Sequence, residues 1–405
     1  MSSSPSPLHL AVALDGAGWH PAAWREPVAR PGELLTAAYW TDLVTEAERG
    51  LLDFVTIEDA LGLQSSSSFT GPDGRTDQVR GRLDAVLIAA RVAPLTHHIG
   101  VVPTVVATHT EPFHLSKAIA TLDYVSTGRA GLRVQITARQ NEAAHFGRRT
   151  FPPFRREDYD TPAVREIVAD AFDEAADYVE VVRRLWDSWE DDAEIRDVAT
   201  GRFIDRDKLH YIDFEGRHFS VKGPSITPRP PQGQPLVSAL AHSTSGYRLV
   251  ARAADIGYVT PSGAGQTRAV VEEIRAEQTA AGRAHETLHV FGDLVVFLDD
   301  DPAEAAARRE RLDGLAGSPY TSDARIFTGT PAQLADLLQE LASAGLSGFR
   351  LRPAVAGHDL PAITQRLVPE LQRRGAFRRV YEAGTLRGLL GLARPANRYA
   401  AAPTA

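Results

Sequence analysis

The sequence contains no cysteine among its 405 residues. This absence excludes a disulfide framework, a thiolate nucleophile and a cysteine-based metal site. The chain also has no long block of charge of one sign, because 44 Lys and Arg residues are interleaved with 52 Asp and Glu residues, for a net charge of -8. This pattern argues against nucleic acid as the main partner.

The chain also lacks a hydrophobic run long enough to span a bilayer. The apolar stretch from Leu8 to Leu14 follows a short Ser/Pro-rich start and has neither a basic leader nor a small-residue cleavage pattern. We therefore expect a cytoplasmic protein that does not associate with membranes.

Several catalytic motifs are missing as well. No Gly-x-Gly-x-x-Gly follows the first apolar strand, which argues against a Rossmann fold. His109 and His114 have no metal-ligand spacing and no His-Glu-x-x-His helix occurs, so no metal site is predicted. Ser243 does not lie in a Gly-x-Ser-x-Gly elbow, which leaves a serine hydrolase as a weak alternative.

The most informative stretch is a complete β-α-β unit. A β-branched run from Ile99 leads into a helix that ends near Gly128, and Leu132 to Ile136 form the next buried strand. Thr110 is expected to be the N-cap of this helix. Four polar residues lie at or near the carboxyl ends of the two strands, where α/β proteins place ligands: Thr104, Thr108, His109 and Thr137.

Eight such strands alternate with helices along the chain, which favours a single (β/α)8 TIM barrel over 1-405. Insertions are expected at about 148-170 and 190-234, with a hairpin near Tyr211 to Phe219. The tail at about 385-405 is expected to be an arm on the surface or at a subunit contact. The predicted strands are Leu8 to Leu14, Leu51 to Ile57, Ile99 onwards, Leu132 to Ile136, Leu236 to Leu240, Ile256 to Val259, Leu288 to Leu298 and Gly348 to Leu351.

Three segments at strand ends carry candidate functional residues. Glu58 and Asp59 follow the second strand as a carboxylate pair, although such a pair is also typical of a helix cap or an ion-pair partner. Ser243 precedes a helix, where it would cradle a phosphate or act as an ordinary N-cap. The loop after the first strand contains His20 and two tryptophans, Trp19 and Trp24, which serve either to pack the barrel end or to contact substrate.

Seven segments together resemble the nitrilotriacetate, pristinamycin-synthase and dibenzothiophene-sulfone monooxygenases of the bacterial luciferase-like superfamily. The resemblance follows the same order over nearly the whole chain. The segments are Trp19 to Arg25, Leu52 to Val55, Thr110 to Phe113, Leu122 to Gly131, Asn141 to Gly147, Leu185 to Trp189 and Gly391 to Tyr399.

This resemblance implies a barrel that binds reduced FMN (FMNH2) from a separate flavin reductase. Oxygen then adds to the flavin, and the resulting peroxyflavin oxygenates a small organic substrate while the protein excludes water. It also implies a homodimer or homotetramer. The cofactor-binding residues carried over by position are Asp59, Thr104, Arg133, Thr137, Phe172, His242 and Ser243.

The chain departs from the family pattern at three places. Leu132 and Arg133 stand where the family commonly has Trp-Asn, and Val168 and Phe172 replace a His-x-x-x-Tyr pair. The phosphate loop has His242 before Ser243 where Gly-Ser-Ser is usual. Arg133 is expected either to pair with the phosphate or pyrimidine end of the flavin or to form a salt bridge inside the barrel.

If a protic group assists the reaction, His20 is the preferred candidate and His242 the next, because histidine donates a proton near neutral pH. Trp19, Trp24 and Glu58 would line the substrate side. Two other functions stay open: a deazaflavin-dependent oxidoreductase of the same fold, and a non-catalytic flavin-binding homologue.

Overall fold

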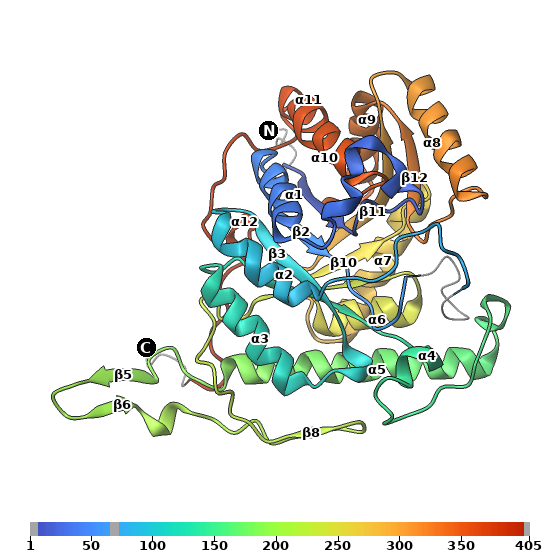
Figure 1. The fold of residues 1–405 in the computed structure, drawn as a ribbon. Helices are drawn as coiled ribbons and strands as arrows, with labels where there is room; N and C mark the ends of the chain where they lie inside the picture. Colours follow the sequence, from blue (N-terminus) through green and yellow to red (C-terminus); the bar gives the residue numbers. More distant parts are fainter. Residues whose placement is uncertain (1–6, 65–72, 401–405) are drawn as a thin grey trace.

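The structure, a computed structural model that describes residues 7-64 and 73-400, is a closed barrel of parallel strands surrounded by helices (Figure 1). β1 pairs with β13 and β10 pairs with β11, which closes the ring. The predicted (β/α)8 fold is therefore confirmed. The eight barrel strands are β1 (His9–Leu14), β2 (Phe54–Ile57), β3 (Gly100–Val106), β4 (Gly131–Gln135), β9 (Leu236–Leu240), β10 (Ile256–Val259), β11 (His289–Leu298) and β13 (Gly348–Pro353).

A further parallel strand, β12 (Arg325–Gly329), was not predicted. It pairs with Leu294 to Leu298 of β11, directly beyond the stretch of β11 that pairs with β10. Four of its five residues are only half-buried. It therefore lacks the continuous apolar run that marked the other parallel strands.

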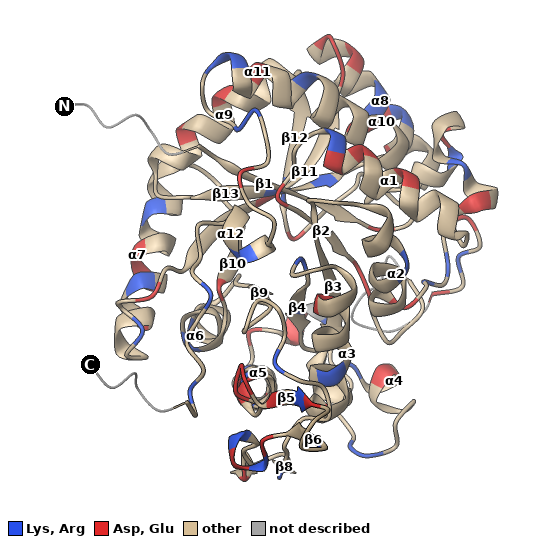
Figure 2. Ribbon diagram, turned by 90° about the vertical axis from the view of Figure 1, so that its left-hand side faces the viewer, with Lys and Arg blue, Asp and Glu red and all other residues tan. Residues whose placement is uncertain are grey.

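Helices cover the outside of the barrel, and acidic and basic residues alternate over them (Figure 2). Their inward faces pack on the strands in one large apolar core. The principal helices are α1 (Ala37–Arg49), α2 (Ala85–Val92), α3 (Pro112–Val125), α5 (Pro162–Asp187), α6 (Thr244–Ala253), α7 (Ala264–Ala280), α8 (Pro302–Ala316), α9 (Pro331–Ser343), α10 (Ala356–Ala362) and α11 (Val368–Arg373).

Helix α3 begins one residue later than its predicted cap allows. Glu111 occupies the N-cap position, and the Thr110 hydroxyl donates instead to the Val106 carbonyl, 2.9 Å away, and lies 2.9 Å from the Tyr178 hydroxyl. The N-cap prediction for Thr110 is therefore wrong. Gly128 ends the connection with φ +87°, a conformation that favours glycine.

The first insertion is more regular than predicted. α5 begins at Pro162, so the second part of the segment at 148-170 is helical, and Val164 and Val168 face the core. The second insertion contains the predicted hairpin as β7 (Phe214–Glu215) and β8 (Ser220–Val221), and an unpredicted one formed by β5 (Glu194–Asp197) and β6 (Arg202–Ile204). Both hairpins lie outside the barrel on the α5 side (Figure 1).

The C-terminal segment closes the base of the barrel, which corrects the prediction of a surface arm. It carries the short helix α12 (Leu386–Leu389), and the side chains of Leu386 and Leu390 are fully buried. They pack against Phe54 and Phe291, whose side chains fill the lower interior of the barrel. Residues 401-405 of the predicted arm lie outside the described residues.

Candidate functional site

The upper half of the barrel interior is filled by charged side chains. Glu58 follows β2, and Arg133 on β4 donates from Nη1 to Glu58 Oε2 at 2.8 Å and to Thr104 Oγ1 at 2.9 Å. Thr104 and Arg133 are register partners on neighbouring parallel strands, so their side chains share the interior face. Arg133 is 2% exposed, and its Nε is buried with no acceptor among the described residues.

Two more arginines extend this network across the barrel. Arg350 and Arg352 lie two residues apart on β13, so both point to the interior. Arg350 donates to both oxygens of Asp293, at 3.1 and 2.7 Å, and to Glu58 Oε1 at 3.2 Å. Arg352 bonds to Asp293 and reaches Asp323 at 2.6 Å. The network thus joins three strands, β4, β11 and β13, through paired carboxylates.

The pairing keeps these groups ionised although they are out of contact with water. Burial alone would raise the pKa of the Asp293 carboxyl, but Arg350 and Arg352 outweigh it and hold that pKa below its ordinary value. Burial lowers the pKa of Arg133, although Glu58 acts against it. A guanidinium stays charged in either case. The salt-bridge interpretation of Arg133 is thus realised in the structure.

Glu58 and Asp59 follow the same strand but have different surroundings. Glu58 is the ion-pair partner of Arg133 and Arg350. Asp59 accepts the Ala60 N–H at 2.7 Å and the first N–H of α2, that of Ala85, at 3.0 Å. Burial raises the pKa of the Asp59 carboxyl above its ordinary value. The alternatives that the sequence left open for this pair, ion pairing and helix capping, are both present.

Polar residues meet at the ends of β3 and β4, as expected for a β-α-β unit. The Thr137 N–H donates to the Thr108 hydroxyl at 3.0 Å, and the Thr137 hydroxyl accepts the Arg139 N–H at 3.3 Å. His109 is buried and stacks on Phe146, with ring centres 5.0 Å apart. These contacts tie the two strand ends together at the mouth of the barrel.

The N-terminus of α6 lies at the same mouth, after β9. Ser243 is its N-cap and accepts the Gly246 N–H at 3.5 Å, while the side chain of His242 stands beside it, 30% exposed. The Thr244 and Ser245 amides form no hydrogen bond within the described residues, as is usual for the first turn of a helix. Ser243 is therefore a helix cap in a position that leaves free amides next to it.

The His242 ring has partners that define its proton. The Thr260 hydroxyl donates to the Asp323 carbonyl at 2.7 Å, so it accepts from His242 Nε2, 3.3 Å away. Burial lowers the pKa of the His242 ring, although Asp323, 3.8 Å from Nδ1, acts in the opposite direction. These contacts assign the neutral ring with its proton on Nε2.

The loop after β1 separates its two tryptophans. Trp19 donates to the Ala13 carbonyl at 3.0 Å and lies under the Arg352 guanidinium, 4.2 Å from its ring centre, so it covers the charged network. Trp24 donates to the Asp77 carbonyl at 3.1 Å and lines a pocket. The packing and substrate-contact interpretations thus apply to one tryptophan each.

The structure does not bring His20 to the other predicted site residues. Its Nδ1 accepts the Ala22 N–H at 3.1 Å, so its Nε2 carries the proton and donates to Asp313 at 3.1 Å. The ring is 1% exposed, and burial lowers its pKa despite Asp313. Both nitrogens are therefore committed to holding the loop against α8.

The two departures on α5 place apolar side chains against the barrel. Val168 is buried, and Phe172 is half-buried and packs on the main core. Neither side chain offers a polar group. The polar contacts at the mouth therefore come from the strand ends and from α6.

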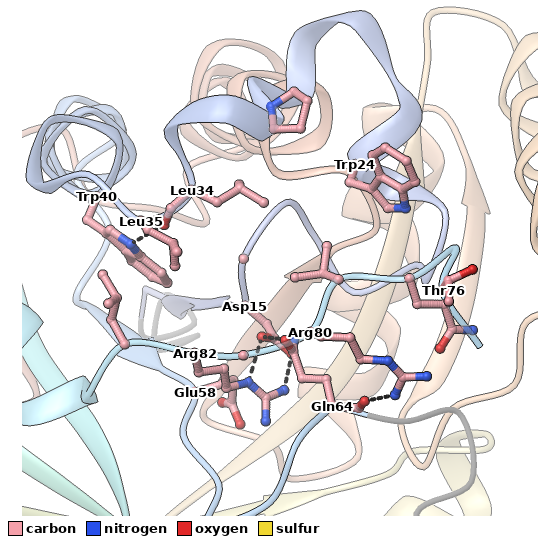
Figure 3. A pocket seen from close by; sticks show the side chains of 16 residues that line it. Asp15, Trp24, Leu34, Leu35, Trp40, Glu58, Gln64, Thr76, Arg80 and Arg82 are labelled. Carbon is pink, nitrogen blue, oxygen red and sulfur yellow. Dashed lines mark hydrogen bonds and ion pairs between the residues drawn. The ribbon is translucent and has the colours of Figure 1, made fainter. Parts of the chain in front are cut away.

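A pocket of about 310 Å³ opens between the loop after β1, the segment at 76-83 and Glu58 (Figure 3). Trp24, Leu34, Leu35 and Trp40 form one wall, and Asp15, Arg80 and Arg82 lie on the other side. Glu58 belongs to both the pocket and the charged network, so the two features meet at the end of β2.

The sequence analysis did not identify most of the charged network or the polar side of the pocket. Arg350 and Arg352 alternate with apolar residues on β13, and Asp293 interrupts a ten-residue buried strand. A charged residue inside such a run must be paired, because an unpaired buried charge is costly. That signal could have found all three residues.

Neither a metal cluster nor a spanning helix occurs in residues 7-64 and 73-400. No group of three or more His, Asp or Glu side chains there could hold a metal ion. None of the helices in that part of the chain is long and apolar enough to cross a membrane.

The fold and the mouth geometry define a class of protein, and comparison with known families agrees. The profile of the luciferase-like monooxygenases matches residues 19-325, and the chain belongs to this family. The predicted family is thereby confirmed. Its similar proteins include nitrilotriacetate, dibenzothiophene-sulfone and pristinamycin IIA synthase proteins.

Three similar proteins show how far the likeness extends. The N-acetyl-S-(2-succino)cysteine monooxygenase of Bacillus subtilis (strain 168) is 29% identical, covering 99% of this chain and 100% of that protein. Nitrilotriacetate monooxygenase component A of Aminobacter aminovorans is 28% identical over 96% and 97% of the two chains. The crystal structure of riboflavin lyase RcaE with modified FMN and riboflavin superimposes with a TM-score of 0.81 at 25% identity, covering 97% and 98%.

Proposed function

We propose that this chain is the oxygenating component of a two-component, FMN-dependent monooxygenase. It would take FMNH2 from a separate flavin reductase and use O2 to oxygenate a small organic molecule. The observation that supports this most is the meeting, at the barrel mouth, of a free helix N-terminus at Ser243, a polar strand end at Thr104 and a pocket that reaches Glu58.

The N-terminus of α6 fits the phosphate of FMN. The amides of Thr244 and Ser245 have no acceptor within the described residues, and the helix dipole favours an anion at this end. The Ser243 hydroxyl accepts one amide and keeps its own proton to donate. We propose that these groups hold the phosphate, with the His242 ring beside them.

The strand ends fit the polar edge of the flavin ring. Thr104 Oγ1 accepts from Arg133, so its proton remains available to a ring nitrogen or oxygen. Arg133 Nε is a buried donor with no protein acceptor among the described residues. Asp59 and Thr137 already hold backbone N–H groups, which fixes their position at this edge. Phe172 would contribute apolar contact only.

Bound FMNH2 would supply the electrons and the activated oxygen for the reaction. The protein would exclude water, for which Trp19 over Arg352 and the apolar pocket wall are suited. His242 holds a proton on Nε2 at the mouth, so we propose it as the protic group. His20 would support the loop rather than take part in chemistry, because both its nitrogens are bonded.

A separate reductase is supported by the names of similar proteins. The Aminobacter protein is named as one component of nitrilotriacetate monooxygenase. Pristinamycin IIA synthase of Streptomyces pristinaespiralis has two differently named subunits, and both are similar to this chain. These names describe multi-protein systems for those proteins. For this chain we propose transient delivery of FMNH2.

The test is the fate of FMNH2 after anaerobic loading and rapid mixing with oxygenated buffer. We expect the protein to slow the release of hydrogen peroxide relative to free FMNH2, and His242→Gln to speed it up without weakening FMNH2 binding. Peroxide release at the rate of free flavin would contradict the proposal. Binding of a reduced deazaflavin in place of FMNH2 would favour the oxidoreductase, and binding of FMN without any effect on oxygen reactivity would favour the non-catalytic homologue.

A further inference from the structure

The pocket beside Glu58 has one apolar wall whose polar atoms are already used. The indole N–H of Trp24 donates to the Asp77 carbonyl at 3.1 Å, and that of Trp40 donates to the Leu34 carbonyl at 3.0 Å. The tryptophans therefore offer carbon surface only. Leu35 adds an apolar side chain that is 68% exposed in the absence of a ligand. This wall is suited to a hydrocarbon or thioether group.

The opposite side of the pocket is charged, but almost every charge has a partner. Asp15 accepts from Arg82 Nε at 3.1 Å and Nη2 at 2.7 Å, as the dashed lines in Figure 3 show. Arg80 bonds to the Gln64 carbonyl and to the Asp73 carboxylate. Glu58 is paired with two arginines of the barrel interior. The walls are therefore close to electrically neutral.

One donor edge is left over in this arrangement. Asp15 occupies Nε and Nη2 of Arg82, and Nη1 has no acceptor among the residues that the structure describes. The Arg82 side chain is 24% exposed and lines the pocket. A single carboxylate can bind there through a charge-assisted hydrogen bond.

A second or third acidic group would have no cation to meet it. It would lose water next to the carboxylates of Asp15 and Glu58, and an unpaired charge in such a place is unfavourable. The Aminobacter protein is named for nitrilotriacetate, which carries three carboxylates. The pocket of this chain is not built for such a polyanion.

Resting on the proposed function, we propose that the substrate is a small monoacid: one carboxylate bound by Arg82 and an apolar arm packed on Trp24, Leu34 and Leu35. The volume of about 310 Å³ lies at the lower end of ligand pockets, which span about 300–1,000 Å³. Glu58 at the pocket floor places the bound molecule next to the barrel mouth.

The experiment is calorimetric titration of the full chain without flavin, using three probes at one ionic strength: 3-phenylpropanoate, its neutral analogue 3-phenylpropan-1-ol, and nitrilotriacetate. We expect the monoacid to bind about tenfold tighter than the alcohol, because a hydrogen bond to a charged group is worth about 1.4 kcal/mol or more. We expect nitrilotriacetate to bind more weakly than the monoacid.

Two variants move this preference in opposite directions. Arg82→Gln should abolish the preference for the acid over the alcohol, whereas Asp15→Asn should increase it by releasing Arg82 from its partner. Arg75→Gln is the matched control, because Arg75 pairs with Asp77 in the same segment but does not line the pocket, and it should leave the ratio unchanged.

Equal binding of acid and alcohol, tighter binding of nitrilotriacetate, no binding of any probe, or an unchanged ratio in both Arg82→Gln and Asp15→Asn would overturn the proposal. Because no flavin is present, these outcomes leave the FMN proposal to its own test. A protein that binds the monoacid as expected but not FMNH2 would retain the pocket assignment and lose the monooxygenase function.

Discussion

The lower and upper halves of the barrel interior are equally buried and chemically opposite. At the base, Phe54 and Phe291 pack against Leu386 from the C-terminal segment. Toward the mouth, Arg350 and Asp293 form an ion pair whose two side chains are 0% exposed. Burial alone therefore does not tell a core from a site. The difference lies in which groups need a specific partner to be buried at all.

The two halves also differ in what they contribute. An apolar base gains stability from every side chain removed from water and has no directional requirement. A buried ion pair gains little net stability, because desolvation offsets the attraction between the charges. We infer that the upper half holds its charges in order to shape the mouth, a division of roles that substitutions in each half can test.

The largest expected effect is the loss of one partner from the upper half. Arg350→Met would leave Asp293 and Glu58 each short of a cation, and we expect the free energy of unfolding to fall by about 3–5 kcal/mol. Urea denaturation at pH 7 measures it. Arg30→Met removes a partly exposed pair with Glu33 and should cost less than about 1 kcal/mol. Similar values for the two variants would contradict the account.

The next effect breaks the base without touching the mouth. Leu386→Ala removes a fully buried side chain from the plug, and we expect a loss of about 3 kcal/mol in unfolding free energy. Affinity for FMNH2, measured at a temperature where the variant is folded, should be unchanged. Val380→Ala, at a side chain that is 62% exposed, is the control and should change stability by less than about 0.5 kcal/mol.

The third prediction affects binding and spares stability. Ser243→Asp keeps a good N-cap but places a negative charge where the phosphate is proposed to lie, so FMNH2 affinity should fall about 100-fold. Ser243→Asn keeps the cap without the charge and should lose far less. Anaerobic titration measures both affinities. A loss in Ser243→Asn as large as that in Ser243→Asp would indicate damage to the helix start instead.

The smallest expected effect is a pH dependence of the upper half. The folded-state pKa of Asp293 lies below its unfolded value, so its contribution to stability is fully present above about pH 4 and is lost as the pH falls further. Asp293→Asn cannot lose a charge. Its stability deficit relative to the unsubstituted chain should therefore shrink by about 1 kcal/mol between pH 5 and pH 3. A constant deficit would contradict the assignment.

Much of the fold could be predicted, because each barrel strand is a run of apolar residues between loop signals. β12 lacked such a run, and the start of α5 at Pro162 followed two prolines at 152-153 that favoured an irregular segment. The C-terminal segment was misassigned because its proline and arginine content is typical of a surface. Only the three-dimensional packing shows that Leu386 and Leu390 fill the barrel base.

The site was predicted where polar residues end a strand, as at Glu58, Thr104 and Ser243. It was missed where the chemistry depends on pairing across the barrel. Asp293 and Arg350 are 57 residues apart and become partners only through the register of β11 and β13. Similarly, Asp15 and Arg82 meet across the pocket from distant loops. Such contacts are set by the closed sheet and have no local sequence signal.

The most direct test of the central claim, that the barrel mouth binds reduced FMN, is an anaerobic calorimetric titration with FMNH2 of the unsubstituted chain, Ser243→Asp and Leu386→Ala. The account predicts saturable one-to-one binding that Ser243→Asp weakens about 100-fold and Leu386→Ala leaves intact. Absence of binding, or equal affinity in the unsubstituted chain and Ser243→Asp, would contradict it.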